Sequence, residues 1–343
     1  MTRLFAAAVS VFVLVLSSDS GRADNVADFY RGKSVTISVG TEPGNSYDIY
    51  TRTLARHLSR HLPGNRNIIV QNAPGAGGLN NANSIYNVAS KDGLSLGQVQ
   101  NTVPFEPFYG NANARFDATK MNWLGSPGKE TAVLLIWHTV PVNSLAEAKS
   151  HGLVLGATGA ASTPAFYGRV INAVFGVPIK LIAGYKSQNE SFLAMERGEN
   201  DGYSSTFWSS LKLTKPDWIA KHKVKLLLQY GGEAAPDLKD VPFAMDVLRD
   251  HADRDLMQIA SAPLALGRPL FAPPGVPGER VTALREAIAA TYRDPEYLAD
   301  CSQQRLECTT SALASDLARL IENAYAAPVA VRERLQKINR SDR

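Results

Sequence analysis

Apolar residues along the chain alternate between two patterns. Some form short continuous runs typical of buried strands, and others recur every three or four positions, as on one face of a helix. Residues 35–40 are predicted to form a strand and residues 41–48 a glycine-containing turn. The residues after this turn are predicted to form a helix. Residues 67–70 and 71–78 repeat the strand and the glycine-rich turn before a second helix. We therefore predict two parallel strands that deliver two glycine-rich loops and two helix N-termini to one edge of a sheet.

This edge of the predicted sheet has the features of an anion-binding site. The first turn of a helix carries backbone N–H groups without intrahelical acceptors, and the helix dipole is positive there. Ser46 is the predicted N-cap of the first helix. Asp48 falls in the first turn of the same helix, where it either faces the dipole or supports the glycine loop from behind. The sequence leaves these two roles of Asp48 open.

Strands followed by small polar loops and helices continue through the rest of the chain. Thr163 is the predicted N-cap of a helix that has Pro164 at its first position. Residues 279–339 are predicted to be mostly helical. This succession predicts parallel sheets covered by helices on both faces. The further strands are predicted at residues 94–99, 133–137, 153–156, 179–182, 201–203, 225–229 and 264–272.

The order of these elements predicts two lobes. The chain builds one α/β lobe, moves into a second near Pro141, and returns toward the first after residue 236. We assign residues 24–136 and 238–343 to lobe one and residues 137–237 to lobe two. The predicted fold class is α/β, with two doubly wound sheets joined by a two-stranded hinge.

Residues 1–23 have the pattern of a targeting segment. Arg3 precedes an apolar stretch at residues 4–16, and Gly21 and Ala23 place small residues before a cleavage point. An uncleaved membrane helix is the alternative, but a stretch of this length is too short to span a bilayer comfortably. We predict a cleaved signal peptide and a soluble periplasmic protein.

Charge and cysteine content narrow the possible partners. The 343 residues carry a net charge of +4 without any basic run, which argues against nucleic-acid binding. The two cysteines, Cys301 and Cys308, would lie about 10 Å apart on one continuous helix, too far for a disulfide. A chain that folds back after the helix would allow the bond. A disulfide and two buried free thiols therefore both remain open.

The sequence offers little for catalysis, a metal or a cofactor. The six histidines lie mostly in polar helical or turn segments, away from the predicted loop edge, so an exported hydrolase is only a remote alternative. His57 and His61 are four residues apart on the first helix, but no glutamate stands between them, and we expect a solvated helix face. A dinucleotide fingerprint would need a glycine where Asn80 stands. We predict no catalytic residue, no metal and no cofactor.

Six segments in a fixed order resemble one known family. The segments are FYRGK at residues 29–33, PGNSYD at 43–48, QNAPGAGG at 71–78, KDG at 91–93, GYK at 184–186 and FAPPGVP at 271–277. Together they resemble the periplasmic receptors of tripartite tricarboxylate transporters, the Bug/TctC-type solute-binding proteins, over residues 28–338. Asn45 departs from the family pattern, because it replaces the second glycine of the first loop.

The resemblance implies a two-lobed type II periplasmic-binding-protein fold with a ligand cleft between the lobes. It implies that backbone N–H groups and small polar side chains bind a small mono- or dicarboxylate. Tyr185 would close over the ligand, and whether Lys186 touches it is open. Lobe one would contribute Gly44, Asn45, Ser46, Ala76 and Gly77, with Asn101 and Thr102 at the mouth, and lobe two Thr158, Gly159, Ser162, Thr163 and Ser204.

The resemblance also implies a biological role. We expect a monomer that delivers its ligand to two integral-membrane transporter subunits. The alternative is a periplasmic sensor subunit that signals to a membrane receptor kinase, since the same fold and cleft would serve both. The identity of the carboxylate does not follow from the sequence.

Overall fold

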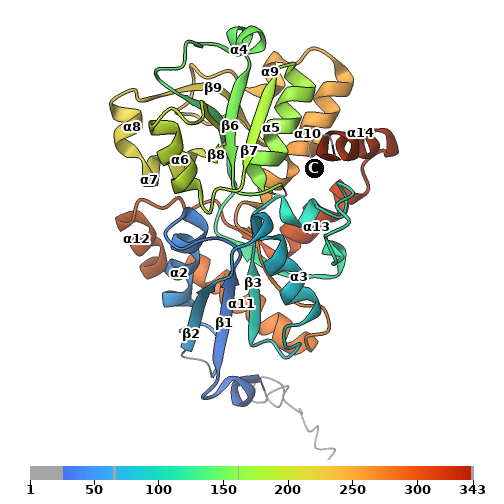
Figure 1. Ribbon diagram of the computed structural model, residues 1–343. Helices are drawn as coiled ribbons and strands as arrows, with labels where there is room; N and C mark the ends of the chain where they lie inside the picture. Colours follow the sequence, from blue (N-terminus) through green and yellow to red (C-terminus); the bar gives the residue numbers. More distant parts are fainter. Residues whose placement is uncertain (1–25, 65–66, 161, 341–343) are drawn as a thin grey trace, which may run out of the picture.

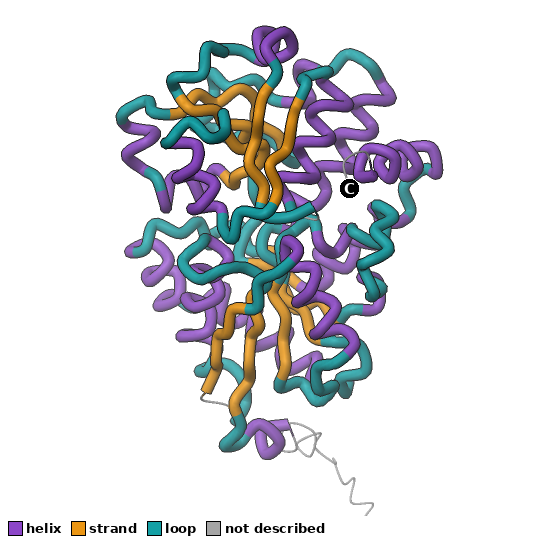
Figure 2. Tube along the Cα trace, viewed as in Figure 1, coloured by secondary structure: helices purple, strands orange, loops and turns teal. Residues whose placement is uncertain are grey.

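The computed structural model describes residues 26–64, 67–160 and 162–340. These residues form two α/β lobes, the first at the bottom and the second at the top of Figure 1. Each lobe has a central sheet with helices packed around it, as Figure 2 shows. The predicted signal peptide, residues 1–23, lies outside the described residues. Within the described part of the chain, none of the helices combines the length and apolar character needed to cross a membrane.

The sheet of the first lobe has the strand order β11-β4-β10-β3-β1-β2. In β1 the apolar side chains of Val35, Ile37 and Val39 are buried and alternate with less buried positions. Strand β1 pairs in parallel with β2 and β3, so the loops that follow β1 and β2 emerge at the same edge, as predicted. The strands are β1 (Ser34–Val39), β2 (Asn67–Asn72), β3 (Ser95–Gln98), β4 (Asn122–Ser126), β10 (Leu270–Ala272) and β11 (Ala312–Leu313).

The helices of the first lobe bury one face against this sheet. Tyr50, Leu54 and Leu58 lie on one side of α2 and pack in a core with apolar residues of β1 and α11. The helical elements here are α2 (Ser46–Leu58), η1 (Ala76–Gly78), α3 (Leu79–Asn87), η2 (Val103–Phe105), η3 (Ala118–Lys120), α11 (Gly278–Arg293), α12 (Pro295–Gln303) and α13 (Ala314–Tyr325).

The sheet of the second lobe has the strand order β7-β6-β8-β5-β9, with β6 parallel to β7 and β8, and β5 antiparallel to β8 and β9. Its strands are β5 (Ala132–Trp137), β6 (Leu153–Ala157), β7 (Ile179–Ala183), β8 (Gly202–Phe207) and β9 (Val224–Tyr230). The helices around it are α4 (Leu145–His151), α5 (Thr163–Phe175), α6 (Gln188–Glu196), α7 (Trp208–Thr214), α8 (Pro216–Ala220), α9 (Ala244–Val247), α10 (His251–Leu266) and α14 (Val329–Arg340).

The observed sheets divide the chain differently from the boundaries predicted at residues 136 and 238. Strand β5 lies in the second sheet, where residues 132–136 are fully buried, so the chain crosses before Ala132. Helices α10 and α14 contact α5 of the second lobe, although both fall in the range assigned to lobe one. The predicted strand at residues 264–272 is also wrong in its first half. Helix α10 continues to Leu266, and Gly267 with φ +60° ends it before β10 begins.

Two neighbouring segments form the predicted two-stranded hinge. Residues 127–131 connect β4 to β5, and residues 267–269 connect α10 to β10. The segments are held together by hydrogen bonds from Glu130 N to the Leu264 carbonyl (3.0 Å) and from Arg268 N to Ser126 Oγ (2.9 Å). The C-terminal helices add a third crossing, because α13 contacts β4 while α14 contacts α5.

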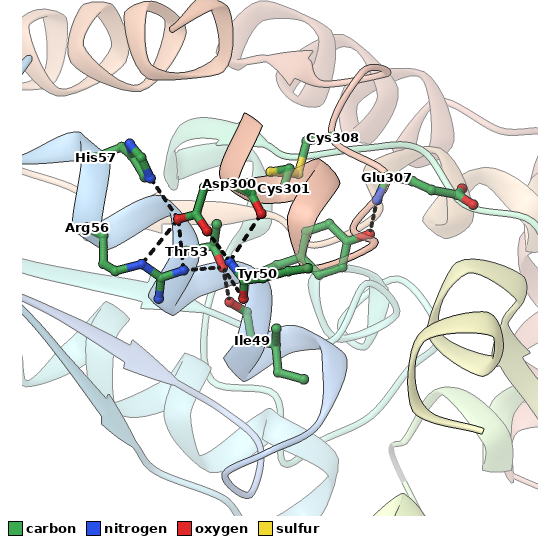
Figure 3. The surroundings of a disulfide bond; sticks show 10 residues. Ile49, Tyr50, Thr53, Arg56, His57, Asp300, Cys301, Glu307 and Cys308 are labelled. Carbon is green, nitrogen blue, oxygen red and sulfur yellow. Dashed lines mark hydrogen bonds and ion pairs between the residues drawn. A yellow bond between two sulfur atoms is a disulfide. The ribbon is translucent and has the colours of Figure 1, made fainter. Parts of the chain in front are cut away.

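Cys301 and Cys308 form a disulfide, which decides between the two alternatives left by the sequence. Helix α12 ends at Gln303, and the chain folds back so that Leu306 N donates to the Cys301 carbonyl (2.8 Å). The bond fixes a loop that packs against α2, because Glu307 N donates to the Tyr50 hydroxyl (2.8 Å), as Figure 3 shows.

The predicted solvated face of His57 and His61 is wrong. His57 Nε2 lies 2.8 Å from Asp300 Oδ2, beside the disulfide, and His61 Nε2 lies 2.8 Å from Asp294 Oδ2. Arg56 also pairs with Asp300 (3.0 Å). These contacts tie α2 and the residues after it to α12 and to its junction with α11, which a helical pattern alone does not reveal.

Replacing both cysteines by serine is expected to lower the free energy of unfolding by about 2–3 kcal/mol, since the bond closes a short loop in the unfolded chain. Urea unfolding of the Cys301→Ser/Cys308→Ser variant beside the oxidised protein measures the difference. A reductant should destabilise the parent protein and leave the variant unchanged. Equal stability of the oxidised parent and the variant would contradict this prediction.

Candidate ligand-binding site

A cavity of about 300 Å³ lies where the carboxyl ends of strands from both sheets meet. It has the position at which open α/β sheets bind ligands. Its lining combines glycine-rich backbone, hydroxyl side chains and aromatic rings. The residues around it are Gly40, Thr41, Glu42, Asn45, Ser46, Tyr47, Pro74, Gly75, Ala76, Gly77, Gly78, Gln100, Thr158, Thr163, Pro164, Gly184, Tyr185, Lys186, Ser187, Gln188, Tyr203, Ser205, Thr206, Phe207 and Ser210.

The N-terminus of α2 points its first turn at this cavity. Asn45, not Ser46, is the N-cap, and its Oδ1 accepts from Asp48 N (3.1 Å). Asn45 Nδ2 donates to the Glu42 carbonyl (2.8 Å), so the side chain that replaces a family glycine is used within the loop. Ser46 is the first helical residue. Its N–H and that of Tyr47 have no intrahelical acceptor, which leaves them available to an anion.

Asp48 supports the glycine loop, one of the two roles that the sequence left open. Its Oδ2 accepts from Gly44 N (2.9 Å), and its Oδ1 accepts from Asn72 Nδ2 and Arg52 Nε (2.9 Å each). Burial raises the pKa of Asp48, but the hydrogen bonds from Arg52, Gly44 and Asn72 outweigh it and lower the pKa overall. The ionised carboxylate therefore joins the first loop to the end of β2, where the second loop starts.

The second loop forms a tight turn against the first. Ala76, Gly77 and Gly78 have φ values of +48°, +70° and +93°. Residues other than glycine rarely adopt these left-handed backbone conformations. A Cβ on Gly78 would lie 3.3 Å from the Gly40 carbonyl oxygen. Ala76, with its strained backbone, lies on the wall of the cavity, and strain of this kind clusters at functional sites in proteins.

The second lobe presents hydroxyl groups from the ends of β6 and β8. Thr158 lines the cavity, and its Oγ1 is buried without a hydrogen-bond partner among the described residues, which is unusual for a buried polar atom. Thr163 begins α5, with Ser162 and not Thr163 at the N-cap position. Tyr47 and Tyr203 line the cavity from opposite lobes. Burial raises the pKa of both side chains, so both hydroxyls stay neutral.

Part of the predicted set of site residues lines the cavity. The lining includes Asn45, Ser46, Ala76, Gly77, Thr158, Thr163 and Tyr185. The predicted residues outside the lining are Gly44, Asn101, Thr102, Gly159, Ser162 and Ser204. Lys186 lines the mouth as an exposed side chain.

The residues outside the lining have other contacts. Ser162 Oγ donates to the Gly159 carbonyl (2.6 Å), and Ser204 Oγ donates to the Pro164 carbonyl. Strand β8 runs to Phe207, beyond the predicted end at Tyr203, so the later residues of the strand reach the cavity instead. A longer strand prediction at residues 201–207 would have found them.

Asn101 and Thr102 join the two lobes behind the cavity. Thr163 Oγ1 donates to Asn101 Oδ1 (2.9 Å) and lies 3.1 Å from Thr102 Oγ1. Thr163 N donates to Gln100 Oε1 (3.2 Å). The rings of Tyr47 and Phe207 also meet across the lobes, with centroids 5.7 Å apart. The structure therefore shows the lobes in contact around the cavity.

Residues 50–336 match the sequence model of the tripartite tricarboxylate transporter family receptor. The chain belongs to this receptor family. No curated protein sequence matches the receptor. Within the described residues, no group of three or more histidine, cysteine, aspartate or glutamate side chains is placed to hold a metal ion.

Solved structures of periplasmic binding proteins share the receptor's fold. The periplasmic binding protein BugD has a TM-score of 0.71 at 18% identity, over 90% of this chain and 98% of the other. MatC from Rhodopseudomonas palustris with bound malate has a TM-score of 0.69 at 18% identity, over 89% and 98%. An R. palustris protein with adipate has a TM-score of 0.66 at 18% identity, over 90% and 97%. The predicted two-lobed type II fold is confirmed.

Gly159 of the second lobe lies close to the second glycine loop. A Cβ at this position would lie 3.1 Å from Gly77 N and 3.3 Å from the Ala76 carbonyl carbon. We expect Gly159→Val to hold the lobes of the receptor apart and to weaken ligand binding by at least about tenfold, a loss of about 1.4 kcal/mol. With ligand present, small-angle scattering should give a larger radius of gyration for the variant than for the parent protein.

Gly232→Val is the matched control, because a Cβ on Gly232 meets nothing within 4 Å and the residue lies outside the cavity lining. It should bind ligand and close like the parent receptor. If Gly159→Val closed around ligand with parental affinity, the contact between the lobes would not limit closure.

Proposed function

We propose that the receptor is an exported periplasmic protein that captures a small organic carboxylate between its lobes. It then delivers the ligand to the integral-membrane subunits of a tripartite tricarboxylate-type transporter. The family match supports a receptor role, and relatives of the same fold carry malate and adipate. A binding role without catalysis agrees with a cavity lined by backbone and hydroxyl groups.

The observation that carries the proposal is the backbone of the two loops. The free N–H groups at the start of α2 and the turn at residues 76–78 line one cavity, together with Thr158, whose hydroxyl has no partner among the described residues. The charged side chains of the lining are Glu42 and the exposed Lys186, so the backbone would bind the anion. A volume of about 300 Å³ is at the lower end of the range for ligand pockets and suits a small acid.

The binding free energies expected for these contacts are consistent with a transport role for the receptor. A helix N-terminus stabilises a carboxylate by up to about 2 kcal/mol, and each charge-assisted hydrogen bond adds roughly 1.5–3 kcal/mol. Three or four such contacts, less the cost of immobilising the ligand, correspond to micromolar binding near about 8 kcal/mol. Contacts to both lobes would shift the population toward the closed form that the membrane subunits recognise.

A thermal-shift screen of residues 24–343 against mono-, di- and tricarboxylates tests this function. The protein should first be unfolded and refolded to remove any ligand acquired during expression. A ligand at about a hundredfold excess over its dissociation constant should raise the apparent stability by about 2.7 kcal/mol. Sugars serve as control ligands. A ligand-free protein that responds to no carboxylate, or to a sugar instead, would contradict the proposal.

A further inference from the structure

A buried ion pair links the two hinge segments directly behind the ligand cavity. Glu130 lies in the segment between β4 and β5, and Arg268 lies in the segment between α10 and β10. Their guanidinium and carboxylate groups are in contact, and the side chains are only 3% and 1% exposed. The guanidinium carbon of Arg268 also lies 3.8 Å from the centroid of the Tyr50 ring and 5.0 Å from that of Phe207. These contacts fix the plane of the guanidinium.

A chain of hydroxyl groups connects this guanidinium to the cavity. Arg268 Nη2 donates to Ser210 Oγ (3.0 Å) and to Ser209 Oγ (3.2 Å), and Ser209 in turn donates to Glu130. Ser210 Oγ donates to Ser46 Oγ (2.7 Å). Ser46 and Ser210 both line the cavity, and both are buried. The chain therefore runs from the hinge through α7 of the second lobe to α2 of the first.

The direction of these hydrogen bonds follows from the chemistry of arginine. A guanidinium has only N–H donors, so Ser210 Oγ must accept from it and can direct its own proton to Ser46 Oγ. Ser46 then accepts from Ser210, and its hydroxyl proton is free to point into the cavity. A series of polarised hydrogen bonds in a buried site strengthens each member. The hinge arginine thereby determines that Ser46 acts as a donor.

We infer that Arg268 is a positioning residue for the ligand: through Ser210 it orients the Ser46 hydroxyl as a hydrogen-bond donor to an anionic oxygen. This inference rests on the proposed function and adds a selection rule to it. A carboxylate oxygen is favoured at this point over a neutral amide, because only the anion forms a charge-assisted hydrogen bond. Ser46 and Ser210 belong to different lobes, so the donor is fixed only when the lobes are closed.

Ser210→Ala tests the inference without removing either buried charge. Calorimetry should compare malate, succinate and adipate with their uncharged diamides, on ligand-free protein. For the acids we expect about a tenfold loss of affinity, as when one charge-assisted hydrogen bond is weakened, and for the diamides less than about threefold. Ser261→Ala is the matched control, because Ser261 is also a buried serine but lies on α10, outside the lining. It should leave both affinities unchanged.

The double variant Glu130→Met/Arg268→Met tests the role of the arginine itself. It should lose the preference for acids to the same extent as Ser210→Ala. The triple variant Ser210→Ala/Glu130→Met/Arg268→Met should lose no more, since the effects of residues that act through one another do not add. The inference would be overturned if Ser210→Ala bound acids with parental affinity, or if it lost equal affinity for acids and diamides. It would also be overturned if the losses in the triple variant were additive. In each case the proposed function would stand. A parent protein that binds none of the three acids would overturn both.

Discussion

Replacing Arg268 alone by methionine is expected to destabilise the receptor by about 3–5 kcal/mol, because the change leaves the carboxylate of Glu130 buried without its partner. Burial raises the pKa of Glu130, and the Arg268 guanidinium and the Ser209 hydroxyl oppose this rise. Without the arginine, folding would favour a protonated Glu130 still more strongly. Urea unfolding of the variant and the parent at neutral pH measures the difference.

The pH dependence of this destabilisation provides a second check. A carboxyl group whose pKa is raised by folding contributes stability at low pH, and this contribution is lost as the pH rises through the folded pKa. The deficit of Arg268→Met should therefore shrink as the pH is lowered from about 7 toward 5. Glu130→Met/Arg268→Met is the control, since it removes both charges and should unfold close to the parent. A single variant as stable as the double variant would contradict this prediction.

Ser46→Pro is expected to weaken carboxylate binding by at least about a hundredfold, or roughly 2.7 kcal/mol, with little change in folding. Proline is favoured at the first position of a helix, and Asn45 before it has the extended backbone (ψ 173°) that a following proline requires. The substitution removes the N–H at the start of α2 together with the hydroxyl that Ser210 orients. Calorimetry and thermal unfolding should be measured on the same preparation.

Ser46→Ala separates the two groups that Ser46→Pro removes together. It loses the hydroxyl and keeps the N–H, so we expect a loss of only about tenfold. Gly77→Val is a less clean test of the site, because φ +70° at Gly77 would strain a β-branched residue and disturb the fold as well. Parental affinity in Ser46→Pro would remove the helix N-terminus from the binding site.

The sequence predicted the parts of the site that depend on neighbouring residues. The two glycine loops follow strands β1 and β2. The strand, the turn and the start of the helix lie within a few residues of one another, and each has its own sequence signal. Parallel pairing of these strands then brings both loops to one edge. The placement of Ser46, Ala76 and Gly77 on the cavity wall follows from these local rules together with the family resemblance.

Other parts of the site depend on contacts between distant segments and could not be predicted. Arg268 follows a helix end and carries no motif, and its partners Glu130 and Ser210 are far from it in sequence. Asn101 and Thr102 follow strand β3, but whether they face the ligand or Thr163 depends on how the lobes meet. The apolar run at residues 264–272 fits a helix end as well as a strand, and only tertiary packing decides between them.

A crystal structure of the receptor with a carboxylate selected by the thermal-shift screen is the most direct test of the central claim, that the backbone of both glycine loops binds an anion between closed lobes. The account predicts carboxylate oxygens within about 3 Å of the N–H groups of Ser46, Ala76 and Gly77, the usual hydrogen-bond distance. It also predicts the Thr158 hydroxyl on the ligand and the contact between Thr163 and Asn101 intact. A ligand held outside this cavity, or bound with the lobes apart, would contradict the account.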